Sequence, residues 1–202
     1  MITKEQYSLL DSLYDFYNKE LFNGQLNDCM ITTSRKKSAY GFFAPETWKK
    51  KSENDLCLHE ISLNPDFLDR EDEKWQGTLV HEMVHLWQKD FGKPSRNAYH
   101  NREWADKMES IGLMPSNTGE PGGKKTGQRI THYIIPDGLF MKAFNLLSEK
   151  NINYFSLPML RGLIKATKAK TKYICPCGNK AWGKPELKIV CAVCNEMFTQ
   201  ED

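Results

Sequence analysis

The sequence predicts an α+β protein, in which helices pack on a small group of strands, followed by a small cysteine-rich unit. Three observations support this prediction: apolar residues at helical spacing at the start of the chain, three strand-like runs behind them, and a helix that contains His81-Glu82-Met83-Val84-His85. At 202 residues the chain is long enough for one substantial domain and a small appendage.

The first part of the chain supplies one helix and three strands. Apolar side chains repeat at helical spacing over residues 3 to 21, and the turn signal Asn23-Gly24 ends this helix. The expected strands span residues 29 to 33, 39 to 44 and 56 to 63, and polar stretches that suit hairpin connections separate them. A helix followed by consecutive short strands fits the α+β class.

The next helix carries the pattern that indicates a function. An acidic segment, residues 69 to 73, leads into an apolar helix that Gly92-Lys93-Pro94 stops. Because His81 and His85 lie four positions apart, they share one helical face about 6 Å apart along the axis, and both imidazoles can bind one ion. Glu82 can then act as general base toward a water activated by that ion. The pattern predicts a catalytic zinc site for hydrolysis.

A catalytic zinc needs a third protein ligand. His100 is the favoured candidate, because it opens the next expected helix after a short connection that can turn the chain back over the first helix. Glu103 and His132 are the alternatives. Tyr99, Tyr133 and His132 are candidates for stabilising the transition state.

The chain is expected to consist of three parts. Residues 113 to 129 are rich in Gly, Pro, Ser and Thr and are expected to be a structureless stretch, of the kind that is usually functional or mobile. A strand at residues 130 to 135 and a helix at 139 to 147 follow. The expected parts are a domain with the histidines at residues 1–150, a basic helical linker at 151–172 and a zinc ribbon at 173–202.

Four of the six cysteines form two close pairs near the end of the chain. Thirteen residues separate the pair Cys175 and Cys177 from the pair Cys191 and Cys194. Two such pairs can place four thiolates around a zinc ion, and a site closed in this way is structural. The first pair has one spacer residue where zinc knuckles usually have two, so a disulfide or a degenerate ribbon is the alternative.

Charge is distributed unevenly along the chain. Residues 120 to 190 hold 13 Lys and Arg against 4 Asp and Glu, a net +9, whereas residues 1 to 119 carry −4 and the last twelve residues −3. A basic region of this kind predicts contact with DNA, single-stranded or duplex, although a merely solvated basic surface is the alternative. The lysines expected to contact phosphates are Lys165, Lys168, Lys170 and Lys172, and Trp182 or Tyr173 could stack on bases.

Other partners and the compartment follow from composition. No apolar run is long enough to cross a bilayer, and the first residues lack the apolar core of a signal peptide, so we expect a cytoplasmic protein without a membrane partner. If bacterial or phage, it would associate with the nucleoid. The strands before the helix with His81 and His85, especially residues 56 to 63, could offer an edge to an extended protein substrate.

Taken in order, these motifs resemble the SprT-like, or Spartan-like, zinc metalloproteases. The resemblance rests on Ile61-Ser62-Leu63-Asn64-Pro65, on the helix from Thr78 to Gln88, on His100 four residues before Trp104, and on the ribbon from Cys175 to Cys194. The basic Gly-rich loop at residues 119 to 129 resembles phage or mobile-element members.

The resemblance implies zinc on His81, His85 and His100, with Glu82 catalytic. It also implies a zincin-like α+β fold and DNA-stimulated proteolysis. The chain departs from the family pattern at two places: Asn101 follows His100 where the family commonly has Gly, and Cys175-Pro176-Cys177 forms a short knuckle.

Three functions are consistent with these residues. The first is a zinc-dependent endopeptidase that acts on DNA-associated proteins, including proteins crosslinked to DNA. The second is a non-catalytic, zinc-containing adaptor that binds nucleic acid. The third is a metal hydrolase that acts on something smaller than a protein. Zn²⁺ is the expected cofactor, with one catalytic ion and one structural ion.

Overall fold

The computed structural model describes residues 1–37, 39–49, 51, 57–96, 99–148 and 171–201. The chain divides into two compact units, Met1–Met159 and Leu160–Asp202. The expected linker at residues 151–172 lies outside the described residues except for Thr171 and Lys172. Across the described ranges, we find no helix with the length and apolar character that crossing a bilayer requires.

The first unit combines helices with short strands, so the predicted α+β class is confirmed. Its helices occur near the positions that apolar periodicity predicts. They are α1 (Ile2–Phe22), α2 (Asp72–Phe91), α3 (Arg102–Ser110) and α4 (Leu139–Ser148), with a short 3₁₀ turn at Pro65–Phe67.

The three predicted strands form one mixed sheet. The strands are β1 (Met30–Thr33), β2 (Gly41–Lys49) and β3 (Cys57–Leu63), in the order β1-β3-β2. β3 runs parallel to β1 and antiparallel to β2, with a bulge in β2 between Ala44 and Trp48. The prediction that residues 56 to 63 offer a free edge is therefore wrong, because β3 is central and pairs on both sides. β2 is the edge strand nearest the histidines.

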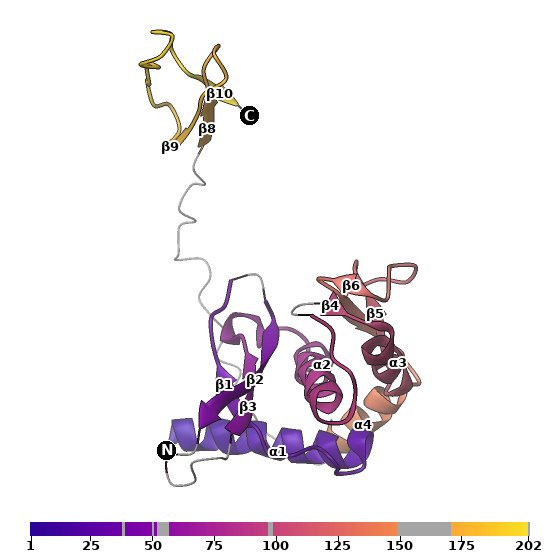
Figure 1. Ribbon diagram of the computed structural model, residues 1–202. Helices are drawn as coiled ribbons and strands as arrows, with labels where there is room; N and C mark the ends of the chain where they lie inside the picture. The colour runs from indigo at the N-terminus through magenta and orange to yellow at the C-terminus, as the bar shows by residue number, and fades with distance from the viewer. Residues whose placement is uncertain (38, 50, 52–56, 97–98, 149–170, 202) are drawn as a thin grey trace. The chain divides into compact units, whose positions relative to one another are not determined.

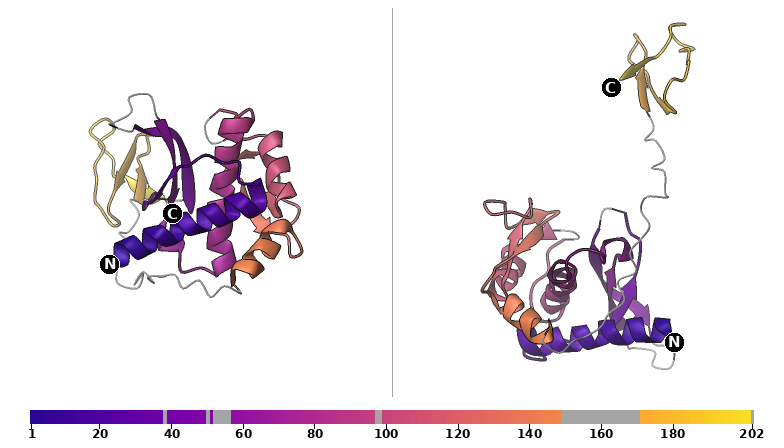
Figure 2. Two further views of the ribbon diagram at one scale, coloured as in Figure 1. Left: turned by 90° about the horizontal axis from the view of Figure 1, so that it is seen from below. Right: turned by 180° about the vertical axis from the view of Figure 1, so that it is seen from behind.

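Helix α2 lies at the centre of this unit. It packs against β2 and β3 on one side and against α3 and α4 on the other, while α1 runs beneath both the sheet and α2 (Figures 1 and 2). Apolar side chains of all these elements join in one core, in which Leu79, Val80 and Met83 of α2 have no exposed surface. Since α2 is buried along much of its length, its polar side chains need partners inside the protein.

The segment expected to be structureless is ordered. β5 (Leu113–Ser116) pairs with β7 (Thr131–Ile134), and β4 (Tyr99–His100) pairs with β6 (Gly127–Gln128). The turn between them is bonded internally: the fully buried Ser116 donates from Oγ to the Glu120 carbonyl. The expectation for residues 113 to 129 is thus wrong, because Ser and Asn side chains in this stretch bond the backbone and shape its turns.

The second unit contains a small three-stranded antiparallel sheet in its described residues. Its strands are β8 (Thr171–Ile174), β9 (Lys180–Gly183) and β10 (Thr199–Glu201), in the order β10-β8-β9. Tyr173 lies in the central strand and is 2% exposed. Its hydroxyl donates to the Lys184 carbonyl and accepts from the Leu187 amide, so this aromatic residue holds the unit together.

Candidate metal centre

Helix α2 positions the first two histidines as predicted. Asp72 and Glu73 occupy its first turn, where acidic side chains favour a helix start. His81 and His85 lie one turn apart, with their ring centroids 5.3 Å from each other. Both rings are directed into the interior of the unit, where His81 is only 8% exposed.

His100 joins them from a strand rather than from a helix. It lies in β4, and α3 begins only at Arg102, because the Asn101 side chain accepts a hydrogen bond from the Trp104 amide as the helix N-cap. The expectation that His100 opens the helix is therefore wrong by two residues. His100 nevertheless reaches α2: its Nε2 lies 3.2 Å from Nε2 of His85.

A backbone carbonyl fixes the orientation of the His100 ring. Its Nδ1 lies 3.2 Å from the Gly127 carbonyl oxygen, to which it can only donate. Gly127 is also the residue that pairs with His100 between β4 and β6. Since Nδ1 carries the proton, the lone pair of Nε2 remains free to bind an ion.

The three histidines fit a zinc ion by their chemistry. One ring nitrogen from each lies within 4.8 Å of those of the other two. Burial lowers the pKa of His81 and His100, and it lowers the pKa of His85 to about 3, so the rings are neutral near pH 7. Three converging imidazoles are a ligand set found in catalytic zinc sites, which keep a further position open, so this cluster is a candidate for such a site.

The Trp104 side chain packs against the rings of all three histidines. Its indole is fully buried, with ring centroids 4.8 Å from His81, 5.2 Å from His85 and 4.2 Å from His100. Its Nε1 is one of two buried side-chain polar atoms without a hydrogen-bond partner among the described residues. Trp104 contacts the cluster as an aromatic surface.

Glu82 lies beside the cluster and under strand β2. Burial raises the pKa of its carboxyl to about 8, while a hydrogen bond from the Phe43 amide and the charge of Lys36 oppose the rise. β2 passes close by: a Cβ at Gly41 would lie 3.3 Å from Cγ of Glu82 and 3.0 Å from the Ser62 carbonyl. Glu82 thus lies between the histidines and the edge strand.

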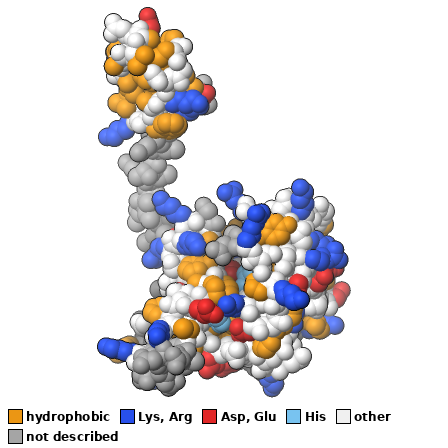
Figure 3. Space-filling view, in the orientation of Figure 1, with side chains coloured by type: hydrophobic (Ala, Val, Ile, Leu, Met, Phe, Trp, Pro, Cys, Tyr) orange, Lys and Arg blue, Asp and Glu red, His pale blue; other side chains and the backbone are white. Residues whose placement is uncertain are grey.

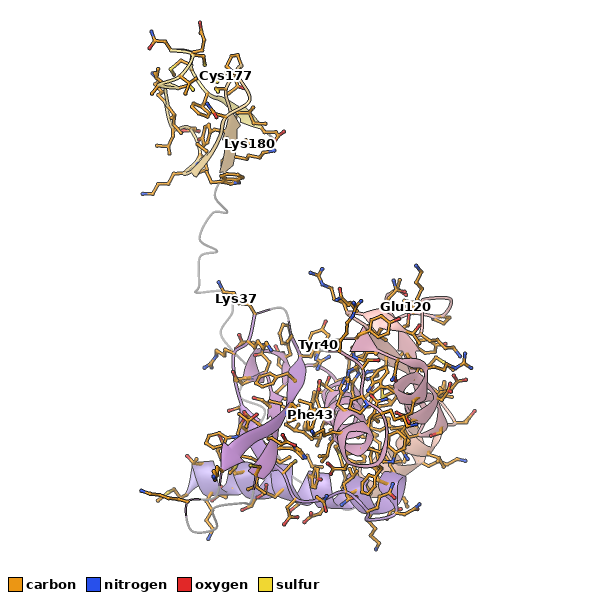
Figure 4. All side chains as sticks on the ribbon, in the orientation of Figure 1. Lys37, Tyr40, Phe43, Glu120, Cys177 and Lys180 are labelled. Carbon is orange, nitrogen blue, oxygen red and sulfur yellow. The ribbon has the colours of Figure 1, made fainter. Side chains whose placement is uncertain are left out.

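Phe43 marks where the edge strand meets the cluster. Its ring is nearly parallel to that of His85, with the centroids 6.5 Å apart, and Figure 4 shows Phe43 between β2 and the helices. In Figure 3, histidine atoms reach the surface between hydrophobic and basic side chains on this side of the unit. The ligand cluster is therefore next to a strand edge.

The alternative ligands have other partners. Glu103 accepts hydrogen bonds from Nε2 of Gln88 and from the Lys93 amide, both at 2.7 Å, so it closes the end of α2. Nδ1 of His132 lies 3.2 Å from Nδ1 of His81, and among the described residues the group of converging ring nitrogens does not include His132. The structure thus groups His100, and neither Glu103 nor His132, with the two histidines of α2.

The four predicted cysteines also come together. Their sulfur atoms lie within 4.8 Å of one another, and Cys177 lies 3.0 Å from Cys175. The short knuckle is closed by a turn in which Gly178 adopts a left-handed φ of +87° and donates to the Cys175 carbonyl. Figure 4 shows Cys177 within this unit. A hydrogen bond from Asn179 leads the causes that lower the pKa of Cys191 to about 6, which favours the thiolate form that binds metal.

The predicted DNA contacts fare differently. Lys165, Lys168 and Lys170 lie outside the described residues. Lys172 forms an ion pair with Glu201. Two aromatic residues were expected to be able to stack on bases. The expectation for Tyr173 is wrong, because its side chain is buried, whereas the side chain of Trp182 is 60% exposed.

With this geometry in view, comparison with known proteins decides the family. The family model described as SprT-like matches residues 10–126, more than half of the chain. The chain belongs to the SprT-like family. The matched residues include α2 and His100, and they end before the cysteine unit.

One curated protein similar to this chain comes from Salmonella typhimurium. It is described as "Uncharacterized protein in mucB 3'region" and is 45% identical to this chain over 40 residues. The match covers 20% of this chain and 54% of that protein, so it spans about half of the relative's length.

Proposed function

We propose that this chain is a zinc-dependent endopeptidase that acts on DNA-associated proteins, including proteins crosslinked to DNA. One observation supports this most directly: three neutral imidazoles converge beside a buried glutamate at the edge of a sheet. His81, His85 and His100 would hold the ion. When bound, zinc supplies a Lewis acid that polarises a peptide carbonyl and makes water acidic enough to attack at neutral pH.

Glu82 would move the protons of the reaction. Its carboxyl is buried next to the three histidines, a position that suits a group that both takes and returns a proton. It would accept a proton from the attacking water and pass it to the amine nitrogen that leaves. The Phe43 amide holds one oxygen of the carboxylate and so orients the other.

Strand β2 would bind the substrate as an added strand. Among the described residues it pairs with β3 along one side and with no strand along the other, and its first half lies over Glu82. An extended peptide that pairs with the open side gains backbone hydrogen bonds and passes the histidines. An extended peptide needs this edge, whereas a small hydrolase substrate does not, so β2 favours a protein substrate over a smaller one.

DNA is proposed as the second partner. The net charge of +9 over residues 120 to 190 would attract phosphates, and Trp182 offers an exposed ring for stacking on a base. We place the structural zinc on Cys175, Cys177, Cys191 and Cys194. Cysteine binds metal as the thiolate. The cytosol keeps such thiols reduced and therefore suits this proposal, with the nucleoid as the site if the chain is bacterial or from a phage.

The test compares the parent chain with its Glu82→Gln variant. Each is incubated with a DNA-binding protein as substrate, in the presence and in the absence of DNA, and cleavage is measured. Glu82→Gln should retain zinc and lose cleavage by at least about 100-fold, the scale of general acid–base catalysis. Glu109→Gln, an exposed carboxylate paired with Lys125, is the matched control and should cleave normally. Undiminished cleavage by Glu82→Gln would contradict the mechanism. Two bound zinc ions without cleavage in either condition would favour the adaptor.

A further inference from the structure

His132 contacts the metal cluster from a strand that the proposed mechanism does not use. It lies in β7, opposite Pro115 of β5, and is 51 residues away from His81 in sequence. Its Nδ1 lies 3.2 Å from Nδ1 of His81, and the two ring centroids are 5.4 Å apart. At this distance the two rings can share a hydrogen bond in which one ring donates and the other accepts.

The second nitrogen of His132 faces helix α2. A Cβ built at Gly77 would lie 3.0 Å from Nε2 of His132, so this nitrogen lies directly against the helix. Both ring nitrogens are therefore directed at protein, one at His81 and one at the position of Gly77. Among the described residues, the converging ligand nitrogens come from His81, His85 and His100 and not from His132, so we look for a role of His132 beside the ligand set.

We propose that His132 is a positioning residue, whose Nδ1 accepts a hydrogen bond from Nδ1–H of His81 and thereby leaves Nε2 of His81 to bind zinc. The proposal rests on the zinc site proposed above. It repeats the arrangement of His100, whose Nδ1 donates to the Gly127 carbonyl. Metal-binding histidines generally donate their second N–H in this way, which fixes the ring and the tautomer.

Gly77 is the residue that makes this contact possible. Glycine inside a helix costs about 1 kcal/mol relative to alanine, so its presence in the second turn of α2 calls for a local reason. The space next to its Cα is occupied by His132. Gly77 therefore lets β7 approach α2 closely enough for His132 to reach His81, one turn further along the helix.

The experiment measures the zinc affinity of the full chain by competition with a chelator. His132→Phe keeps a buried ring but removes the acceptor, and it should weaken zinc binding at the histidine site by about 10–100-fold. Gly77→Ala should weaken binding in the same direction, because its methyl group displaces His132 without removing it. His132→Gln, which keeps an acceptor, should bind more tightly than His132→Phe. In the cobalt-loaded chain, the visible absorption of the histidine site should change in His132→Phe.

Two controls separate the possible outcomes. His59→Phe removes another partly buried histidine, which bonds Asp90 and the Glu46 amide, and should leave zinc affinity unchanged. His85→Ala reports the zinc held by the cysteines alone. If His132→Phe and Gly77→Ala bind zinc as tightly as the parent chain, or if they lower only the free energy of unfolding of the zinc-free chain, the positioning role is overturned. If the parent chain binds no more zinc than His85→Ala, the proposed zinc site itself fails.

Discussion

The three histidines lie in a unit that has a large core of its own, whereas the four cysteines lie in a unit with almost none. Around the histidines, side chains from α1 to α4 and the sheet are fully buried. In residues 171–201 the buried hydrophobic side chains are Tyr173, Cys175 and Cys191. Two of these three are themselves candidate ligands. A zinc ion bound by the histidines would therefore supply a reactive site to a unit that is already folded. A zinc ion bound by the cysteines would be needed for its unit to fold.

The largest expected effect follows from this difference. Chelation, or Cys175→Ser, should unfold residues 171–201 completely, because Tyr173 alone cannot replace the metal as a core. The first unit should stay folded. Hydrogen exchange followed by mass spectrometry should show amide protection lost in β8 to β10 and kept in α2. Cys57→Ser, at an exposed free cysteine, should change neither unit. A cysteine unit that stays protected after chelation would contradict the comparison.

Trp104→Ala tests the opposite claim, that the histidine unit depends on packing. Removal of this fully buried indole should lower the free energy of unfolding by about 3–5 kcal/mol, as for other large-to-small core changes. It should also weaken zinc binding, since the ring contacts all three histidines. Urea unfolding measures the first effect. Trp48→Ala, at a residue 44% exposed, should cost much less, and equal costs would contradict the packing argument.

Acid and base should both destabilise the chelator-treated first unit. Burial lowers the pKa of His81, His85, His100 and His132 from 6.5, so the unfolded chain binds more protons below that pH and stability falls as the pH falls. Burial raises the pKa of Glu82 from 4.5 to about 8, so the folded chain binds the extra proton and stability falls as the pH rises toward 8.

The histidines outnumber Glu82, so stability should peak near pH 7 and fall toward pH 5.5 by on the order of 2 kcal/mol per pH unit. Urea unfolding across pH 5 to 9 measures this profile. Glu82→Gln should remove the decline above pH 7 and keep the decline below it. A decline above pH 7 that persists in Glu82→Gln would show that another group causes it.

The smallest expected effect concerns the departure from the family pattern after His100. Asn101 caps α3, accepts a hydrogen bond from Gln88 and donates to the Lys93 carbonyl. Asn101→Gly should cost about 1 kcal/mol of stability, since glycine is itself a fair N-cap, and should leave zinc affinity unchanged. Thermal unfolding and the chelator assay measure the two quantities. A fall in zinc affinity would mean that Asn101 acts on the metal site.

The sequence predicted those features of the fold and the site that depend on residues close together along the chain. The pairing of His81 with His85 follows from helical spacing, and the cysteine cluster follows from two close pairs. The location of β1, β2 and β3 follows from apolar runs. Their order does not, because a strand's pattern is the same at the edge and in the centre of a sheet, and for this reason the free edge was assigned to β3 instead of β2.

The contacts that orient the site come from distant segments and escaped prediction. The Gly127 carbonyl, the Phe43 amide and the His132 ring each depend on how strands pair or pack, which periodicity does not encode. Ser116 likewise reads as a loop residue, although its hydroxyl is the bonded centre of an ordered turn. Gly77 was the one available signal, since a glycine inside a buried helix indicates close approach.

The pairing of β4 with β6 also sets the order in which the site can form. His81 and His85 become neighbours as soon as α2 forms, a local event. His100 acquires its carbonyl partner only when the chain closes a loop of 27 residues to Gly127, which costs entropy and occurs late. The third ligand is therefore fully oriented only when β4 has paired with β6. Zinc at this position would bind most tightly to the completely folded chain, because a chain without this pair lacks the contact that fixes the His100 ring.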